Sequence, residues 1–220
     1  MMNELIIFSI YSALLIGVML IAEFAYKVFK INTEWTRKIA HVGSGIIALT
    51  YPMYHNTHWT VLGLTLSFTI ILYTSKKMGL FQSIFSVERN SYGELFFVWS
   101  TWLLFMLYQF SGDVSYFYLA FSSVVFADPM AALIGKPFPV KKYTIFGNTK
   151  SFGGSFSFFI VSFALSYFYL LEVGSSMNIL LFSITHAFIL TLVEAISSKG
   201  LDNLTIPIAS VLFIYFSSII

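Results

Sequence analysis

Residues 114–135 read VSYFYLAFSSVVFADPMAALIG, and residues 136–155 continue as KPFPVKKYTIFGNTKSFGGS. The first part is long enough for a membrane-spanning helix, which needs about 17–25 mostly apolar residues, and its one charged residue is Asp128. The second part is basic and rich in glycine. This switch in hydropathy predicts a membrane helix followed by a loop, and the same alternation recurs along the chain.

The composition of the whole chain agrees with that interpretation. Hydrophobic residues make up 58% of the sequence and charged residues 10%, whereas about 25% of residues are charged in soluble proteins. Apolar segments lie near 5–26, 39–54, 59–75, 94–110, 114–135, 153–172, 176–196 and 203–220. We therefore expect an all-α polytopic membrane protein with about eight transmembrane helices (seven to nine), forming a single domain over residues 1–220.

The basic residues predict the topology. All twelve Lys and Arg residues fall in every second gap, namely 27–38, 76–93, 136–152 and 197–202. Because basic residues favour cytoplasmic loops, we expect these gaps inside the cell and both termini outside. Topology thus explains the lysines, so the net charge of +2 does not indicate a nucleic-acid partner. The absence of cysteine excludes disulfide and thiolate chemistry.

Asp128 is the most unusual residue for its expected depth in the bilayer. A charged group there costs several kcal/mol unless it faces a polar cavity or a partner, which points to a functional role. Pro129 disfavours helix at the preceding residue and suits a helix start. We therefore expect the span to break, with Asp128 as the N-cap of a short helix that ends at Gly135. A purely structural N-cap is the alternative.

The basic loop ends in Lys150, Ser151, Gly153 and Gly154, where the next span starts. Free N–H groups and the dipole at a helix N-terminus favour phosphate, and glycines permit close approach. An acid that can hold Mg²⁺ beside a phosphate site is typical of nucleotide enzymes. We expect this loop to act with Asp128, although Lys150 could also be an ordinary membrane anchor.

A third group comprises Glu194, near the end of the seventh span, with Asp202 and Asn203 at the start of the eighth. We expect these side chains to lie at the same depth as Asp128. Asp and Asn are also ordinary turn and cap residues, so that alternative stays open.

Arg37, Lys38 and His41 form a fourth group, because residues three and four apart share a helix face. His41 is expected to be a base or a hydrogen-bond donor to phosphate, or a simple interfacial residue. His186 is expected to hydrogen-bond between helices, and His55 to be interfacial or solvated.

Five sequence blocks occur in a characteristic order: Arg37-Lys38-x-x-His41, Tyr92-Gly93-Glu94, Asp128-Pro129-x-Ala131-x-x-x-Gly135, Lys150-Ser151-x-Gly153-Gly154-Ser155, and Glu194-x₇-Asp202-Asn203-Leu204-Thr205-x-Pro207. Together they resemble the polyprenol kinase family of dolichol, phytol, farnesol and geranylgeraniol kinases. That family is related to the phosphatidate cytidylyltransferases. The resemblance implies an integral membrane enzyme that uses CTP to phosphorylate a long isoprenoid alcohol.

With the resemblance, the residues above acquire expected roles in one transmembrane catalytic domain. Mg²⁺ is expected on Asp128, Glu194 and Asp202. The catalytic residues are expected to be Asp128, Lys150, His41 and Asp202. The nucleotide is expected to contact Arg37, Lys38, Lys136, Lys150, Ser151, Gly153, Gly154 and Asn203.

Two other functions stay open at this point. A CDP-lipid-forming cytidylyltransferase would attack the α-phosphate, but the sequence Gly200-Leu201-Asp202-Asn203 favours the kinase. A transporter of an anionic metabolite or lipid would also suit intramembrane acids, yet the polar residues gather on one side. We expect a multi-pass protein of the cell membrane (the endoplasmic reticulum in a eukaryote) with a cytoplasmic active site. The identity of the alcohol and a homodimeric state stay open.

Overall fold

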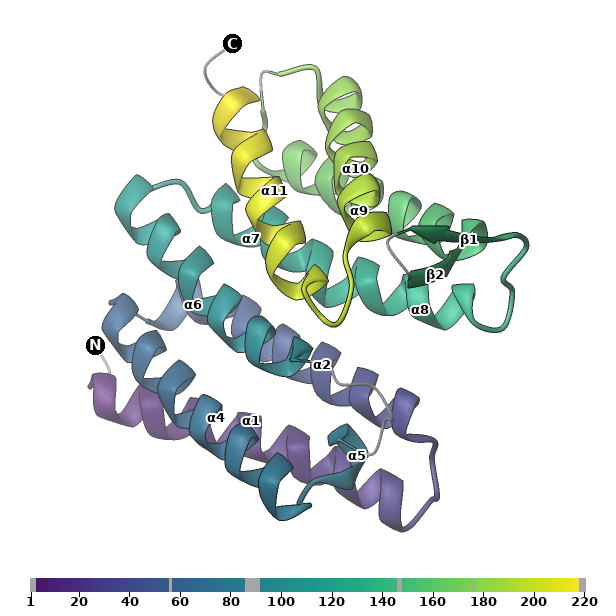
Figure 1. Ribbon diagram of the computed structural model, residues 1–220. Helices are drawn as coiled ribbons and strands as arrows, with labels where there is room; N and C mark the ends of the chain where they lie inside the picture. The colour runs from purple at the N-terminus through teal and green to yellow at the C-terminus, as the bar shows by residue number, and fades with distance from the viewer. Residues whose placement is uncertain (1–2, 56, 86–91, 146–147, 176, 218–220) are drawn as a thin grey trace. The chain divides into compact units, whose positions relative to one another are not determined.

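The computed structural model describes residues 3–55, 57–85, 92–145, 148–175 and 177–217. Its secondary structure is almost entirely helical, which confirms the all-α class apart from one small two-stranded hairpin (Figure 1). Contacts within the chain divide it into two compact units, Met1–Val114 and Ser115–Ile220. Each unit is described by itself below. That the whole chain acts as one catalytic domain stays a prediction.

The first unit is a set of packed helices. Its elements are α1 (Glu4–Lys27), α2 (Thr33–Leu49), α3 (Tyr51–Tyr54), α4 (His58–Met78), α5 (Gln82–Phe85) and α6 (Gly93–Ser111). The side chains of Asn32 and Thr57 cap the first turns of α2 and α4, as such residues commonly do. Gly79 and Gly112 end α4 and α6 in the left-handed conformation that glycine adopts without strain. Helix α1 packs against α2 and α4, and α4 packs against α6.

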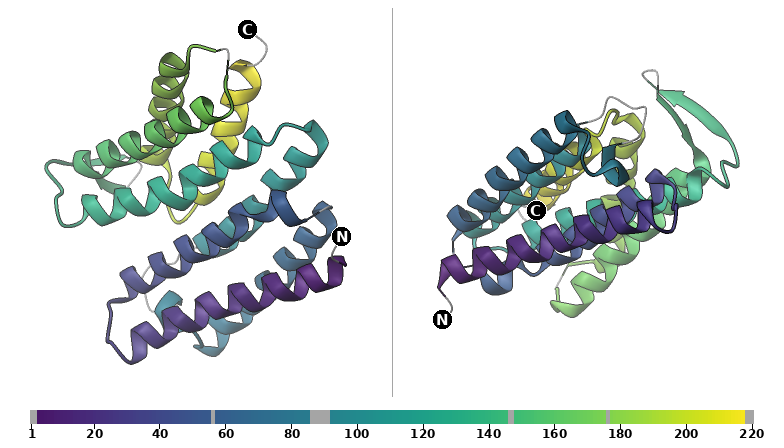
Figure 2. Two further views of the ribbon diagram at one scale, coloured as in Figure 1. Left: turned by 180° about the vertical axis from the view of Figure 1, so that it is seen from behind. Right: turned by 90° about the horizontal axis from the view of Figure 1, so that it is seen from below.

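The second unit carries the hairpin. Its elements are α7 (Ser115–Ser122), the π-helical segment η1 (Ser123–Ala127), α8 (Asp128–Gly135), β1 (Lys142–Ile145), β2 (Asn148–Ser151), α9 (Phe152–Glu172), α10 (Ile179–Ile196) and α11 (Asp202–Ser217). Helix α9 packs against α8 and α10, and α10 packs against α11. The strands are antiparallel, with Lys142 opposite Ser151. Figures 1 and 2 show the hairpin beside the end of α8.

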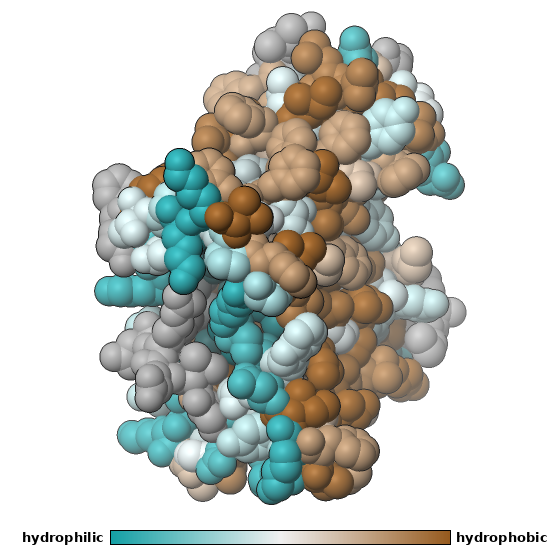
Figure 3. Space-filling model, turned by 90° about the vertical axis from the view of Figure 1, so that its right-hand side faces the viewer, coloured by the Kyte–Doolittle hydropathy of each residue, from teal (hydrophilic) through white to brown (hydrophobic). Residues whose placement is uncertain are grey.

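The apolar helices fit a membrane protein. Among the described residues, four helices are long and apolar enough to cross a bilayer: Glu4–Lys27, Ser115–Gly135, Phe152–Glu172 and Ile179–Ile196. They coincide with four of the predicted spans, and Asp202–Ser217 is a shorter apolar helix. Hydrophobic side chains cover much of the face shown in Figure 3. The full number of eight spans and the external termini stay predictions.

The helix containing Asp128 does not break, so the expected N-cap role was wrong. Asp128 has helical dihedral angles (φ −62°, ψ −47°), and its N–H donates to the carbonyl of Ser123 across a π-turn. Pro129 lacks an N–H, and its ring would clash with the carbonyl four residues earlier in a regular helix. The wider π-turn accommodates the proline, as π-bulges do within helices, frequently at functional sites. The predicted end of this helix at Gly135 is confirmed.

His186 joins three helices of the second unit, which confirms its expected role. The side chain is fully buried in α10. Its Nδ1 lies 2.6 Å from the hydroxyl of Ser166 on α9, and its Nε2 lies 2.8 Å from the hydroxyl of Ser210 on α11. Interhelical hydrogen bonds of this kind help to fix helix packing in a bilayer, because no hydrophobic effect drives helices together there.

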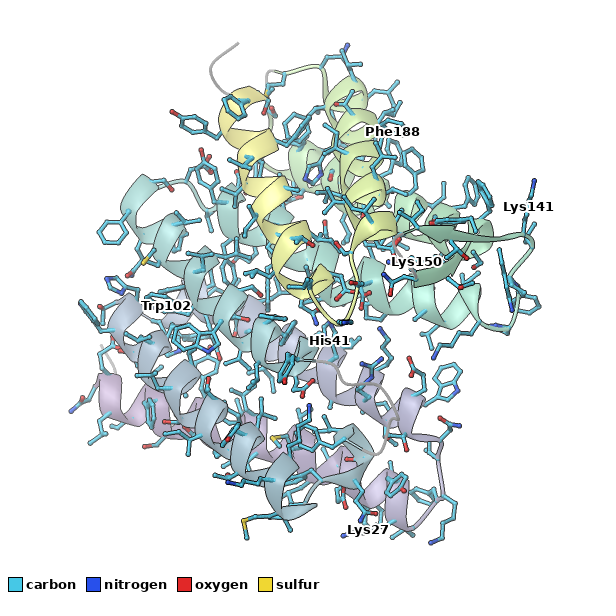
Figure 4. All side chains as sticks on the ribbon, in the orientation of Figure 1. Lys27, His41, Trp102, Lys141, Lys150 and Phe188 are labelled. Carbon is cyan, nitrogen blue, oxygen red and sulfur yellow. The ribbon has the colours of Figure 1, made fainter. Side chains whose placement is uncertain are left out.

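Replacement of His186 by leucine should therefore loosen the bundle of α9, α10 and α11. The change removes both interhelical hydrogen bonds of His186, although the hydroxyl of Ser166 still donates to the carbonyl of Ser162. We expect a loss of about 1–3 kcal/mol in the free energy of unfolding. Unfolding of the purified protein in mixed detergent would measure this loss. Phe188→Leu is the matched control, because Phe188 lies on the same helix with its side chain exposed (Figure 4). Equal stability of both variants would contradict the prediction.

His55 is buried, contrary to the expectation of an interfacial or solvated residue. It is 5% exposed and packs between the rings of Tyr11 and Tyr51, with ring centroids 4.7 and 4.9 Å away. Burial lowers the pKa of His55 to about 4, although the carboxylate of Glu4, 3.9 Å from its Nδ1, opposes the shift. His55 is therefore neutral at pH 7 and belongs to the packing of the first unit.

Candidate active site

Lys150 and Glu194 form a buried ion pair at the centre of the predicted site residues in the second unit. The ammonium group of Lys150 donates to both the carboxylate and the backbone carbonyl of Glu194. The two side chains are only 18% and 7% exposed. The pair joins the end of β2 to the last turn of α10, where the carbonyl end of the helix favours a cation. In Figure 4 Lys150 lies close to this end of α10, whereas Lys141 extends away from the helices.

Two further carboxylates lie within electrostatic range of Glu194. Glu194 interacts electrostatically with Asp128 at the start of α8 and with Asp202 at the start of α11. These three acids come from helices far apart in the sequence, and their convergence on one metal ion stays a prediction. One oxygen of Glu194, Oε2, is buried and has no hydrogen-bond partner among the described residues. A buried carboxylate oxygen of this kind is costly unless a donor or a cation satisfies it.

The donor set of this cluster is suitable for Mg²⁺ together with a nucleotide. Within the described part of the chain, no three acidic, histidine or cysteine side chains are already gathered as a metal cage. Mg²⁺ in nucleotide enzymes is usually held by one or two carboxylates, with phosphate oxygens and water completing the shell. Asp128, Asp202 and the unsatisfied oxygen of Glu194 offer that chemistry. Which of them bind the ion stays a prediction.

The start of α9 is built differently from the predicted phosphate loop. Ser151 is its N-cap, and its hydroxyl accepts from the N–H of Gly154 at 3.2 Å while donating to the carbonyl of Gly135 at 3.1 Å. The N–H of Phe152 donates to the carbonyl of Lys141. Two N–H groups of the first turn are thus already hydrogen-bonded within the protein. A phosphate could still bind here through Lys150 and the remaining dipole.

The glycines at this helix start allow close approach of protein backbone. A Cβ at Gly154 would lie 2.8 Å from the carbonyl oxygen of Ala131 and 3.2 Å from the Cα of Gly135. A Cβ at Gly135 would in turn lie 3.0 Å from the Cα of Gly154. The two glycines thus let α8, which begins at Asp128, touch the start of α9, which directly follows the strand that carries Lys150. The expected nucleotide contacts of Gly153 and Gly154 stay predictions.

A substitution of Gly154 by alanine should push α8 and α9 apart. The new methyl group meets backbone atoms that cannot move out of its way, and such overpacking costs about 1–3 kcal/mol of stability. Thermal unfolding of the purified protein would measure the effect. Gly17→Ala is the matched control, because nothing lies within 4 Å of a Cβ at Gly17, and alanine there should be neutral or stabilising. A lower melting temperature for the control than for Gly154→Ala would contradict this account.

The fourth group of predicted residues lies in the first unit, on α2. Arg37 pairs with Glu34 at 3.1 Å, and Lys38 is buried. His41 packs against the ring of Phe97 on α6, with centroids 4.3 Å apart. These contacts place the group on one helix, as expected. Their roles toward a nucleotide stay predictions.

The other predicted residues have simple positions. Lys136 is exposed directly after α8, and Asn203 is buried in the first turn of α11, where its N–H donates to the carboxylate of Asp202. Glu94 pairs with Lys76 at 3.2 Å. Arg89, the other basic residue near Glu94 in the sequence, lies outside the described residues.

Sequence reasoning missed the hairpin that carries Lys150. The segment Lys-Tyr-Thr-Ile at 142–145 alternates in exposure and is rich in residues that favour strands. Tyr143 fastens this strand to α9, because its hydroxyl lies 2.5 Å from that of Ser155. The same alternation was readable in the sequence, but basic loops between spans are normally taken as irregular.

Comparison with known proteins adds an independent finding. No family model and no solved structure matches the chain significantly. Among curated proteins, phytol kinase from Synechocystis sp. (strain ATCC 27184 / PCC 6803 / Kazusa) is 29% identical over 205 residues. The match covers 92% of this chain and 87% of that protein. The resemblance to the polyprenol and phytol kinases that the sequence blocks predicted is therefore confirmed along nearly the whole chain.

Proposed function

We propose that this chain is a membrane kinase that transfers the γ-phosphoryl group of CTP to the hydroxyl of an isoprenoid alcohol. The observation that carries the proposal is its similarity to a phytol kinase over 92% of its length. The buried pair of Lys150 and Glu194, with Asp128 and Asp202 near it, supplies groups of the right kind for phosphoryl transfer. The choice of CTP rests on the family resemblance alone.

The reaction makes limited covalent demands on the protein. The bond between the γ-phosphorus and the β–γ bridging oxygen breaks, and the alcohol oxygen forms a new bond to the same phosphorus. CDP leaves, and the proton of the alcohol passes to a base, for which a carboxylate of the cluster or His41 is the candidate. Such transfer depends mainly on positioning and electrostatic stabilisation. Mg²⁺, when bound, supplies neutralisation of charge on the phosphate oxygens.

Lys150 has a specific part in this proposal. In the structure its ammonium group is bonded to Glu194. A nucleotide phosphate would compete with that carboxylate for the ammonium group, since both are anionic acceptors. If Lys150 turns to the phosphate, Glu194 becomes available to a metal ion. The ion pair is thus suited to hold the site together before the nucleotide binds.

The experiment uses purified protein reconstituted with Mg²⁺ and a mixture of isoprenoid alcohols and phosphatidate. CTP is labelled at either the α or the γ phosphate. Label from the γ position in the lipid fraction, with release of CDP and loss of the signal in EDTA, is the expected result. The labelled lipid identifies the alcohol. Parallel reactions with ATP, GTP and UTP test the nucleotide preference.

Other outcomes would replace the proposal. Label from the α position with release of pyrophosphate would make the protein a cytidylyltransferase. Transfer of neither label into lipid, by protein that still binds nucleotide, would leave a kinase of another acceptor or a transport role. Equal rates with all four nucleotides would remove the CTP specificity while keeping the kinase.

A further inference from the structure

The turn between α8 and β1 exposes an unusual combination of apolar and basic side chains. Phe138 is 68% exposed and Val140 is 85% exposed. Lys141 and Lys142 follow directly and are also exposed. Neighbouring exposed apolar side chains with polar residues at their rim commonly mark a protein or membrane contact site.

This turn is held in place rather than left to adapt. The carbonyl of Phe138 lies so close to α9 that a Cβ at Gly153 would come within 2.5 Å of it. The carbonyl of Lys141 accepts from the N–H of Phe152 at 2.8 Å. Val140 has a positive φ of 38°, which is a strained conformation for a β-branched residue. The turn therefore has a strained backbone at Val140 and leaves the side chains of Phe138 and Val140 exposed.

The position of the turn along the chain indicates what covers it. It begins directly after Ser115–Gly135 and the hairpin ends directly before Phe152–Glu172, both of which are long and apolar enough to span a membrane. A turn tethered to two spans at the same end has to lie close to the bilayer surface. There, apolar side chains enter the boundary between headgroups and acyl chains, while lysines meet the phosphates of anionic lipids.

We propose that residues 138–142 form a membrane-interface anchor, with Phe138 and Val140 inserted in one leaflet and Lys141 and Lys142 on the phosphates of anionic lipid. The anchor holds the hairpin against the bilayer. Because Lys150 lies on strand β2 of that hairpin, the anchor also fixes the height of the site above the lipid. The insertion itself does not depend on which reaction the site performs.

The absence of cysteine from the chain permits a direct test. Single-cysteine variants Phe138→Cys and Val140→Cys are made in the full-length protein and labelled with a nitroxide, so that each retains the other apolar residue. Thr144→Cys, which is exposed on β1, is the matched control. Each protein is placed in bilayer discs of phosphatidylcholine, with or without phosphatidylglycerol. The accessibility of the label to oxygen and to a water-soluble nickel chelate then reports its depth.

We expect the labels at positions 138 and 140 to favour oxygen over the chelate, and the label at position 144 to favour the chelate. Phosphatidylglycerol should raise the fraction of labels that lie in the bilayer. The double variant Lys141→Gln with Lys142→Gln should lower the ratio of inserted to exposed label by roughly fivefold for each lysine. The two labelling positions are tested in separate variants. If one variant misfolds, the other still measures the depth of the turn, provided that its thermal transition is unaltered.

Two results would overturn the proposal, the first for the apolar side chains and the second for the lysines. In the first, the labels at positions 138 and 140 are as accessible to the chelate as the label at position 144, in both lipid compositions. In the second, the double glutamine variant raises the KM for nucleotide while the depth of the labels is unchanged. That outcome would assign Lys141 and Lys142 to the nucleotide instead of the lipid.

Discussion

Replacement of Lys150 by methionine is expected to reduce phosphoryl transfer by roughly a hundredfold or more, since one positioned electrostatic contact typically contributes that much. The free energy of unfolding should fall by about 3–5 kcal/mol, because the change leaves Glu194 as a buried and uncompensated charge. Both side chains are well shielded from solvent, at 18% and 7% exposed. The rate of γ-label transfer and chemical unfolding in detergent measure the two effects. Lys77→Met is the control, as an exposed lysine in the last turn of α4 to which no role in the site is assigned.

A second variant separates a structural role of this pair from a catalytic one. Lys150→Met combined with Glu194→Leu removes both charges, and replacing a buried ion pair by apolar residues is often neutral for stability. We expect the double variant to recover most of the stability lost in Lys150→Met and none of the activity. Recovery of activity together with stability would show that Lys150 only caps α10, and it would remove this residue from the nucleotide site.

The helices of the second unit were predictable because membrane spans depend mainly on local hydropathy. The span at residues 114–135 was expected and forms the continuous segment Ser115–Gly135. The expected break at Asp128 was wrong for a physical reason. A proline within a helix can be accommodated by a break or by a π-bulge. Which of the two forms depends on packing against α9, and no local sequence pattern contains that information.

The sequence indicated which residues belong to the candidate site, but not which of them contact one another. Lys150 and Glu194 were both expected in the site, yet as ligands of two different groups. Their ion pair joins positions 44 residues apart in the sequence, and the contact follows from how β2 meets the end of α10. Gly154 illustrates the same limit, since a glycine at a helix start suits either a phosphate or a neighbouring backbone. Only the position of Ala131 on α8 shows that backbone contact occurs.

Replacement of Asp128 by asparagine is expected to lower activity without lowering stability. Asparagine preserves the shape of the side chain and removes its charge, so transfer of the γ-phosphate should fall on the order of a hundredfold to a thousandfold. Asp128 lies near enough to Glu194 for their like charges to repel each other. Removal of one charge relieves that repulsion, and the thermal transition should stay unchanged or rise.

The dependence on Mg²⁺ distinguishes a metal ligand from a residue that merely shapes the helix. If Asp128 helps to hold the ion, Asp128→Asn should raise the Mg²⁺ concentration required for half-maximal activity, and Asp202→Asn should do the same. Asp113→Asn is the matched control, because this carboxylate is exposed in the turn after α6. A folded Asp128→Asn protein with full activity and an unchanged Mg²⁺ requirement would exclude the metal role. The site would then depend on Glu194 and Asp202, and the cost of an acid at this depth in the membrane would need another explanation.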